Sequence, residues 1–308
     1  MKLTILGSSS ALPTSERNPS AHVLCAHERL YLIDCGEGTQ MQMRKCKIRF
    51  SKINHIFISH LHGDHIFGLF GLLSSFNLMG RGQPLNIYAP ANFNKILKSY
   101  LEDFDIKLGF EVIFTELNCK DPFVILDDKY LTVTAFPLRH RIPAFGFLFS
   151  EKKADRKIRK EKIEVYNIPI AKMNAIKKGE DLIREDGIII KNEEITISPP
   201  KPLSYAYCSD TSYFQQLSSY VKGTDLIYHE ATFGNDLRDL AELTGHSTAA
   251  DAARVASEAG AGTLIIGHFS SRYKNPEILV EQAREIFPST YPAEDGKTYK
   301  IIDNNKNI

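Results

Sequence analysis

The most constraining feature of the sequence is a cluster of four metal-type side chains within six residues. Residues 59–65 read Ser-His-Leu-His-Gly-Asp-His and directly follow an apolar run, Ile53 to Ile58. Imidazole and carboxylate groups are the ligands that zinc uses where thiolates are absent. A histidine-rich turn with satisfied core side chains is the alternative. Four such residues between a predicted strand (52–59) and a predicted helix (65–79) favour a metal site instead.

The spacing within this cluster predicts two metal positions. In an extended turn, the alternation of His60 and His62 sends both rings to one side, while Asp64 and His65 can reach a second point on the same rim. Two cations about 3.5–4 Å apart fit such a divided arrangement. Two metals need more ligands than this turn offers, so the remaining ligands must come from distant parts of the chain.

Three further candidate ligands each come just after an apolar strand. His140, Asp210 and His268 follow the predicted strands 130–136, 203–208 and 263–267. Functional residues of α/β sheets gather outside the carboxyl ends of the strands. A single histidine at a strand end would be explained by a structural hydrogen bond, but three such residues together with the cluster favour a shared site. A carboxylate such as that of Asp210 can bridge two cations.

Other polar residues suit supporting roles. Asp34 ends a predicted strand, where its carboxylate can hydrogen-bond a ligand histidine or cap the following helix. A histidine that binds no metal, oriented by a carboxylate, forms a general-acid pair. His246 and the pair His229-Glu230 supply candidates for these roles, and a structural role is an equal alternative for each. Three further histidines lie in a strand, in a turn and inside the apolar run, and we interpret them as structural or exposed: His22, His27 and His55.

Composition excludes several classes of protein. A net charge of +1 gives no information about the kind of partner that the protein binds. Five widely spaced cysteines without a Cys-x-x-Cys pair argue against a disulfide framework or a thiolate zinc site, and fit a reducing compartment. The first apolar run is too short for a signal peptide, and no stretch approaches the roughly 18 apolar residues that span a bilayer. We therefore expect a cytoplasmic protein that does not contact membranes.

Short apolar strands alternate with helical stretches up to residue 150 and again from residue 203. Between them lies a charged segment, 151–199, with ten basic and four acidic residues over 151–178 and a reversed balance over 179–194. It is too polar to be core, so we expect an excursion from the body of the protein. The two β/α halves predict a layered α/β fold with two mixed sheets, whose strand order the sequence leaves open.

The His60–His65 motif, with Asp34, His140, Asp210 and His268 in this order, resembles the metallo-β-lactamase superfamily. A narrower resemblance is to the ribonuclease Z family of tRNA 3′-processing endonucleases. It rests on five stretches: Pro13–Ser20, Asp34–Gln40, His229–Thr232, Gly245–Thr248 and His268–Tyr273. The match runs from Leu6 to Tyr273 and is broken mainly at the charged segment. The histidine motif alone specifies only the superfamily.

The resemblance implies a four-layer αββα sandwich of the metallo-β-lactamase type. It would be a single domain over residues 1–308, with 151–199 inserted as a protruding arm. Two zinc ions are implied, although His/Asp sites also accept Mn²⁺ or Fe²⁺. One ion would lie on His60, His62 and His140, the other on Asp64, His65 and His268, with Asp210 between them, Asp34 behind a ligand, and Glu230 orienting His246.

The resemblance also implies partners. The family arm grips the tRNA body, often across a homodimer, which predicts precursor tRNA and a second copy of the chain as partners. By spacing alone the basic run is a solvated helical face, but its place in the charged segment favours phosphate contacts. Where the family arm carries a Gly-Pro-rich tip, this chain has Ile168–Asp181. The candidate RNA-binding residues are Arg17, Asn18, Lys152, Lys153, Arg156, Lys157, Arg159 and Lys160.

The expected reaction is removal of the 3′ trailer from precursor tRNA. A hydroxide between the two zinc ions, formed near pH ~7, would attack the phosphorus in line. Asp64 would help to hold this nucleophile, and His246, assisted by Glu230, would protonate the departing 3′-oxygen. The products would be a tRNA with a 3′-hydroxyl and a trailer with a 5′-phosphate.

Three alternatives keep the fold and change the function. A phosphodiesterase for small or cyclic nucleotides would have no use for the long basic segment or for residues 13–18. A non-catalytic RNA-binding protein on a decayed scaffold would have lost ligands, whereas all seven positions are filled. A lactamase or a thioesterase would have no use for the elements that resemble those of tRNA-processing enzymes.

Overall fold

The computed structural model describes residues 1–303. They divide into two compact units, each of which we describe by itself. The body consists of Met1–Ser150 with the chain from Leu203 onward, and the arm is Glu151–Pro202. The arm therefore ends at Pro202 and not at residue 199.

The first sheet of the body has seven strands in the order β18-β1-β2-β3-β4-β5-β6. Strands β3 to β6 pair in parallel, and the strands on the other side pair antiparallel. The bounds are β1 (Lys2–Gly7), β2 (Ala21–Ala26), β3 (Arg29–Ile33), β4 (Ile53–Phe57), β5 (Leu85–Pro90), β6 (Val112–Leu117) and β18 (Thr298–Lys300).

The second sheet also has seven strands, in the order β17-β16-β15-β14-β9-β8-β7. Strands β14 to β17 are parallel, so the carboxyl ends of β14, β15 and β16 share one edge. The bounds are β7 (Phe123–Asp127), β8 (Leu131–Leu138), β9 (Ala144–Glu151), β14 (Ser204–Cys208), β15 (Leu226–Glu230), β16 (Thr263–Gly267) and β17 (Thr290–Pro292).

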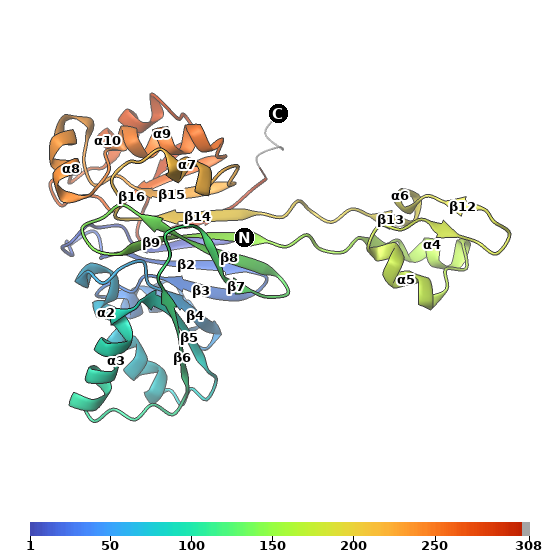
Figure 1. Ribbon diagram of the computed structural model, residues 1–308, viewed down its shortest axis with the longest axis horizontal. Coiled ribbons are helices and arrows are strands. Elements are labelled where there is room, and N and C mark those ends of the chain that lie inside the picture. The colour runs from blue at the N-terminus through green and yellow to red at the C-terminus, as the bar shows by residue number, and fades with distance from the viewer. Residues whose placement is uncertain (304–308) are drawn as a thin grey trace. The chain divides into compact units, whose positions relative to one another are not determined.

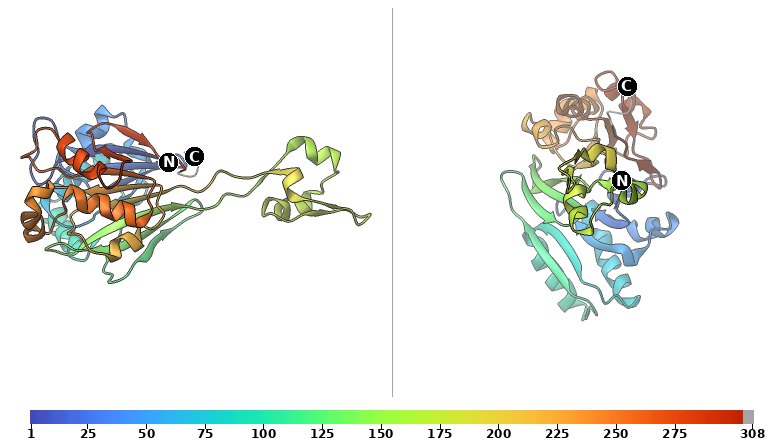
Figure 2. Two further views of the ribbon diagram at one scale, coloured as in Figure 1. Left: turned by 90° about the horizontal axis from the view of Figure 1, so that it is seen from above. Right: turned by 90° about the vertical axis from the view of Figure 1, so that its right-hand side faces the viewer.

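Helices cover the outer faces of both sheets, as Figures 1 and 2 show. Those following strands of the first sheet are α1 (Thr39–Lys45), η1 (Phe50–Lys52), α2 (Gly63–Leu78) and α3 (Asn92–Asp103). Those of the second half are α7 (Gln216–Tyr220), η2 (Asn235–Leu237), α8 (Arg238–Thr244), α9 (Ala249–Ala259) and α10 (Glu277–Arg284). Among the described residues, no helix combines the length and the apolar composition that a membrane crossing requires.

Two apolar clusters account for this layering. One fills the space between the inner faces of the sheets, where Phe57 of the first sheet contacts Phe147 and Phe149 of the second, and it continues beneath α9. The other lies between the first sheet and α1 to α3, with Leu69 and Phe93 among its members. Burial of apolar area on both faces of both sheets stabilises a four-layer αββα sandwich, which confirms the predicted fold class.

The arm has a small core of its own. Its secondary structure consists of β10 (Lys157–Ile158), α4 (Lys160–Val165), α5 (Ile170–Lys177), β11 (Leu182–Ile183), β12 (Ile189–Ile190), α6 (Asn192–Ile195) and β13 (Thr196–Ile197). Strands β10 and β13 pair, as do β11 and β12. The expectation that this segment is too polar to be core is wrong, because six aliphatic residues are buried together: Ile158, Ile168, Ile176, Leu182, Ile190 and Ile195.

The predicted strands and the predicted helix lie within a few residues of β4, α2, β8, β14 and β16, but no predicted element corresponds to β9. This strand is central, lying between β14 and β8, and its residues from Ala144 to Phe147 are all buried. A strand buried on both faces shows no alternation of apolar and polar residues, so period-two reasoning cannot detect it. The short elements α7, α8, α10 and β17 were also missed.

Candidate metal centre

Three of the predicted site residues occupy an unusual backbone conformation at strand ends. Asp34, Asp210 and His268 follow β3, β14 and β16 and have φ angles of 55°, 56° and 56°. Left-handed backbone is disfavoured for residues with a Cβ, and such strain concentrates at functional sites. All three side chains are buried. The turn at each strand end therefore places a polar side chain where a continued strand would not.

The remaining cluster residues lie on the connection from β4 to α2. His60 is in the connecting loop, His62 is the N-cap residue, and Asp64 and His65 belong to the first turn of α2. This turn packs tightly on the loop after β3, since a Cβ on Gly36 would lie 2.3 Å from the carbonyl oxygen of Asp64. Only glycine allows that approach, which fixes the start of α2 against the first sheet.

The first ligand group brings three imidazole nitrogens and one carboxylate oxygen together. His62 Nδ1 lies 3.0 Å from His60 Nε2 and 3.2 Å from His140 Nε2. Asp210 Oδ2 lies 3.5 Å from His60 Nε2 and 3.8 Å from His140 Nε2. Ligands at 2.0–2.1 Å from a tetrahedral zinc ion are about 3.3 Å apart. The spacing of the group therefore suits one such ion.

The second ligand group lies on the other oxygen of the same carboxylate. Asp210 Oδ1 is 3.2 Å from both His65 Nε2 and His268 Nε2. Asp64 Oδ2 is 3.5 Å from His65 Nε2 and 3.4 Å from His268 Nε2. Each oxygen of Asp210 thus faces a different group of ligands, which is the geometry that a carboxylate between two cations requires.

The carboxylate of Asp34 belongs to neither ligand group but hydrogen-bonds the ligand residue His65. Its Oδ2 accepts hydrogen bonds from His65 Nδ1 (2.7 Å), Ser59 Oγ (2.8 Å) and Tyr207 Oη (2.7 Å), and its Oδ1 accepts one from the Ser59 amide. A proton on Nδ1 leaves Nε2 of His65 as a lone pair directed at the ligand group. The alternative role of Asp34 as a helix cap is wrong, because Gly38 is the N-cap residue of α1 and no side chain caps it.

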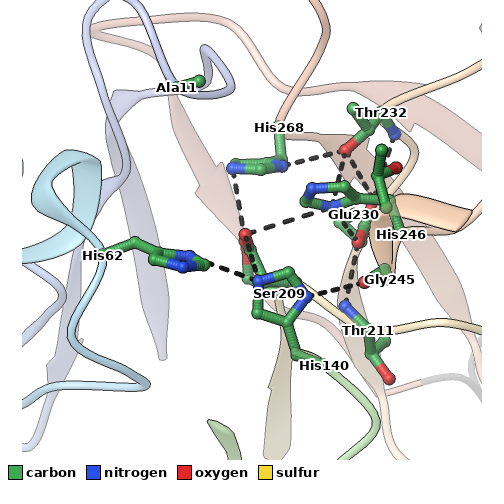
Figure 3. Close-up of polar contacts among 12 residues, drawn as sticks. Ala11, His62, His140, Ser209, Thr211, Glu230, Thr232, Gly245, His246 and His268 are labelled. Atoms are coloured by element: carbon green, nitrogen blue, oxygen red, sulfur yellow. Dashed lines mark hydrogen bonds and ion pairs between the residues drawn. The ribbon is translucent and has the colours of Figure 1, made fainter. Parts of the chain in front are cut away.

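A second buried carboxylate, Glu230, connects two histidines. Its Oε1 accepts a hydrogen bond from His246 Nδ1 at 2.8 Å, and its Oε2 accepts one from Thr232 Oγ1 at 2.6 Å. Thr232 Oγ1 in turn accepts one from His268 Nδ1 at 2.9 Å. His140 Nδ1 donates to the carbonyl oxygen of Gly245 at 2.8 Å. These bonds place a proton on Nδ1 of all three rings, and Figure 3 shows the rings directed toward one another.

The protonation equilibria divide the histidines into two kinds. Burial lowers the pKa of His60 well below its ordinary value, and it also lowers the pKa of His62 and His140, so these rings are held in the neutral form that binds metal. Burial opposes charge on His65 as well, but the charges of Asp210, Asp64 and Asp34 outweigh it and raise the pKa of His65 well above its ordinary value. Carboxylates that attract a proton there also attract a metal cation.

These observations test whether the residues fit a metal. His65 Nε2 is buried and has no hydrogen-bond partner within residues 1–303, although it points at two carboxylates. Nitrogens of His60 and His62 face each other at 3.0 Å, which a shared cation explains better than two competing lone pairs. The donor set of imidazoles and carboxylates suits zinc and related divalent ions. The residues present therefore fit a metal centre.

His246 is the one cluster histidine whose geometry admits two roles. Its ring could join Asp210 and His268 as a ligand, since the three donor atoms lie within 4.8 Å of one another. Its Nδ1, however, is engaged by Glu230, and His246 lines a cavity beside the ligands. Burial opposes a charge on this ring, but Glu230, Asp210 and Asp64 outweigh it and raise the pKa of His246 to about 9.

Several residues of the centre were not found from the sequence. Ser59 and Tyr207 hold Asp34, and Thr232 links Glu230 to His268. The backbone amide of Ala11 donates to Asp64 Oδ2 at 2.9 Å. Two of these residues could have been found from their position in the sequence. Ser59 directly precedes the histidine cluster, and Thr232 is the last residue of the His229–Thr232 stretch. Nothing in the sequence marked Ala11 or Tyr207.

The predicted RNA-binding residues lie outside this cluster. Arg17 donates to the carbonyl oxygen of Tyr273, and Asn18 donates twice to Asp295, so both tie the loop after β1 to distant parts of the body. In the arm, Nε of Arg156 and Nε of Arg159 donate to Thr196. The basic run is not one helical face, because residues 152–156 have no regular secondary structure, Lys157 belongs to β10 and Lys160 begins α4. The three histidines set aside on sequence grounds, His22, His27 and His55, belong to neither ligand group.

Comparison with solved structures places this architecture among known folds. The short form of human tRNase Z matches with a TM-score of 0.72 and 28% identity, over 98% of this chain and all of that chain. Unliganded yeast PDE1 matches with a TM-score of 0.60 but only 14% identity, which shows the shared fold alone. A family model described as anti-Pycsar protein Apyc1 matches residues 1–153.

Curated relatives match over nearly the whole chain. Ribonuclease Z of Bacteroides fragilis is 44% identical over 295 residues, covering 96% of this chain and 97% of that protein. Ribonuclease Z of Phocaeicola vulgatus is 45% identical over 297 residues, covering 96% of each chain. Identity at this level over full length, joined with the two-sided Asp210 and the paired His246 and Glu230, shows that this chain belongs to the ribonuclease Z family.

Proposed function

We propose that this protein is a phosphodiester hydrolase that removes the 3′ trailer from precursor tRNA. The observation that carries the proposal is the position of Asp210, whose two oxygens face two separate ligand groups beside a histidine paired with a buried carboxylate. The relatives named Ribonuclease Z and the human tRNase Z supply the substrate class. The products would be a tRNA with a 3′-hydroxyl and a trailer with a 5′-phosphate.

We infer two divalent ions per chain, with zinc as the first candidate and Mn²⁺ or Fe²⁺ as alternatives. His60, His62 and His140 would hold one, Asp64, His65 and His268 the other, and Asp210 would contribute one oxygen to each. When bound, such ions polarise a phosphoryl oxygen and supply a nucleophilic solvent molecule at neutral pH. Asp64 also faces the cavity in which the phosphate would lie, so its carboxylate can help to orient that solvent molecule.

His246 is suited to protonate the departing 3′-oxygen. Its Nδ1 proton is held by Glu230, and its side chain lines the cavity, so the proton on Nε2 is the one available to a substrate. The raised pKa of about 9 keeps the ring charged at neutral pH. Glu230 is itself held by the amides of Thr211 and Thr232, which prevents it from turning away.

The arm would contact the body of the tRNA through phosphates. Lys152, Lys153, Lys157 and Lys160 are exposed, whereas Arg156 and Arg159 use their Nε atoms within the arm and retain terminal nitrogens for a ligand. Such contacts weaken with salt because they release counterions. Arg17 and Asn18 already hydrogen-bond Tyr273 and Asp295, so we propose that they mainly hold the loop after β1 in place. Any phosphate contact that they make would be in addition to these bonds. A homodimer and a cytoplasmic location follow only from the family relationship and are part of the proposal.

The decisive experiment maps both ends produced from one precursor tRNA that carries a 3′ trailer. A single cut that leaves a 3′-hydroxyl and a 5′-phosphate, and that a chelator abolishes until zinc is restored, is expected. Turnover of a cyclic nucleotide in the same assay tests the alternative phosphodiesterase. Faster turnover of the cyclic nucleotide, with no cut in the precursor, would overturn the proposal.

A further inference from the structure

The cavity beside the metal centre is lined by two chemically different kinds of residue. Its volume is about 490 Å³. The polar lining includes the ligand residues His62, Asp64, Asp210 and His268, together with His246, Glu37 and Arg141. The apolar lining consists of Ala11, Leu12, Pro13, Pro19 and Phe67. The polar residues suit a phosphate near the metal ligands, whereas the apolar residues have no role in binding a phosphate.

Phe67 is the apolar lining residue that most needs an explanation. It is 64% exposed, although it lies in the first turns of α2 close to Asp64 and His65. Its ring leans over the main chain of Gly63, since a Cβ on that glycine would lie 2.2 Å from the ring. A single exposed aromatic residue is ordinary on a protein surface. A ring that lines the cavity of the metal centre and rests on a rigid helix start is suited to receive a ligand.

The chemistry of the proposed substrate supplies that ligand. An RNA strand that is cut at this centre places one base on each side of the scissile phosphate. Every base has a flat aromatic face, and stacking on an aromatic side chain is worth about 1–3 kcal/mol per base, independent of sequence. A trailer differs from one precursor to another, so a contact that tolerates any base is the kind that its first nucleotide requires.

The position of His246 decides which base reaches Phe67. If His246 protonates the departing 3′-oxygen, the last nucleotide of the tRNA lies on the side of His246. Figure 3 shows His62, which immediately precedes α2, across the cluster from His246. Gly63 directly follows His62, and the ring of Phe67, one helical turn later, rests on Gly63. The nucleotide that keeps the phosphate, the first of the trailer, therefore extends toward Phe67.

We propose that the ring of Phe67 is a stacking platform for the first base of the trailer. This inference rests on the proposed function and adds a base-binding subsite to it. Phe67 would position the substrate and would take no part in the chemical step. The contact should therefore not affect the rate of cleavage of a substrate that lacks this base.

The test combines a protein change with a substrate change. Single-turnover rates are measured for the unmodified protein and for Phe67→Ala, each on a precursor tRNA and on the same precursor with an abasic first trailer nucleotide. For the unmodified protein, loss of the base should slow cleavage by about 5- to 150-fold, which is the stacking energy expressed as a rate ratio. Phe67→Ala should be slow on the intact precursor and should lose little more on the abasic one. Phe67→Leu, which keeps apolar volume but has no aromatic face, should resemble Phe67→Ala.

Two controls separate stacking from general damage. Phe104 is 69% exposed at the end of α3 and does not line this cavity, so Phe104→Ala should keep the unmodified ratio of the two rates. Methyl 4-nitrophenyl phosphate carries only a methyl group on the trailer side, so Phe67→Ala should lose far less on this ester than on the precursor. If removal of the first trailer base slowed the unmodified protein and Phe67→Ala by the same factor, the inference would be overturned. It would also be overturned if the effect of Phe67→Ala depended on the last base of the tRNA and not on the first base of the trailer. Failure of the unmodified protein to cut any precursor would overturn the proposed function as well.

Discussion

At the scale of single residues, His246 is distinguished from the ligand histidines by its bond to Glu230. We expect His246→Ala to keep its full metal content while cleavage of precursor tRNA falls by roughly 10²- to 10⁴-fold, because only the proton donor is lost. Metal analysis and single-turnover kinetics measure the two quantities. By contrast, His140→Ala removes a ligand from the first group and should lose metal.

The leaving group provides a sharper control for the same change. A ribose 3′-oxygen leaves poorly without a proton, whereas nitrophenolate is stable as an anion and needs none. His246→Ala should therefore be much less impaired on methyl 4-nitrophenyl phosphate than on precursor tRNA. Equal losses on the two substrates would mean that His246 shapes the centre and does not donate the proton.

The charge of Glu230 should set the alkaline limit of activity. Burial disfavours a charge on His246, but Glu230 outweighs it and raises the pKa of His246 to about 9, so the acid form is present below that pH and is lost as pH rises through it. In Glu230→Gln the raising charge is gone, and the pKa should fall toward the ordinary 6.5. We expect the alkaline limb of the rate of tRNA cleavage to move to lower pH in this variant. An unmoved limb would exclude His246 as the titrating group.

At the scale of elements, strand β14 offers a matched pair of tyrosines. Tyr205 and Tyr207 are two residues apart, on the same face, and both are fully buried. The Tyr207 hydroxyl donates to Asp34, which holds the ligand His65, whereas the Tyr205 hydroxyl contacts His22 at 3.1 Å. Loss of a direct outer partner costs about 10- to 100-fold in metal affinity. Tyr207→Phe should weaken metal binding by less than that, because it acts one bond farther away.

Chelator competition measures this effect without any substrate. Tyr205→Phe removes a hydroxyl of equal burial and should leave metal affinity unchanged. Thermal unfolding of both variants in the presence of chelator should give similar midpoints if the two hydroxyls contribute equally to the metal-free fold. A shift of metal affinity in both variants would show that packing of β14, and not the bond to Asp34, controls the centre.

The same strands show what sequence reasoning can reach at this scale. The positions of His140, Asp210 and His268 after apolar strands were visible because a short β-type run ends at each of them. The left-handed backbone at Asp34, Asp210 and His268 was not visible, because it arises where the strand end meets the packed loops around it. Strand β9 was hidden by its uniform apolar pattern.

At the scale of the whole molecule, the two-sided role of Asp210 depends on strand order. It follows β14, which the second sheet places between β9 and β15. The sequence predicted that seven residues converge, but it could not assign each oxygen of Asp210 to a group, because non-local pairing decides where β14 lies. The six buried aliphatic residues of the arm were missed for a similar reason, since they are spread over separate short elements.

The division into body and arm leads to a prediction about the complete molecule. Both ligand groups and both large apolar clusters belong to the body, and the arm has its own core. Ser150 and Ser204 are paired across β9 and β14, so an Asn-Gly turn can join them when residues 151–203, the arm together with Leu203 of the body, are removed. This variant should keep its metal and should still cleave methyl 4-nitrophenyl phosphate.

Cleavage of precursor tRNA by the armless variant should instead fall by roughly 100-fold or more at moderate salt, because the phosphate contacts assigned to the arm are gone. A full-length protein with Lys152→Glu and Lys153→Glu should show an intermediate loss, and its rate should depend less steeply on salt than that of the unmodified protein. Equal loss of ester and tRNA cleavage in the armless variant would mean that the arm maintains the metal centre. Undiminished tRNA cleavage would mean that the body alone recognises the substrate, through the cavity that Phe67 and His246 share.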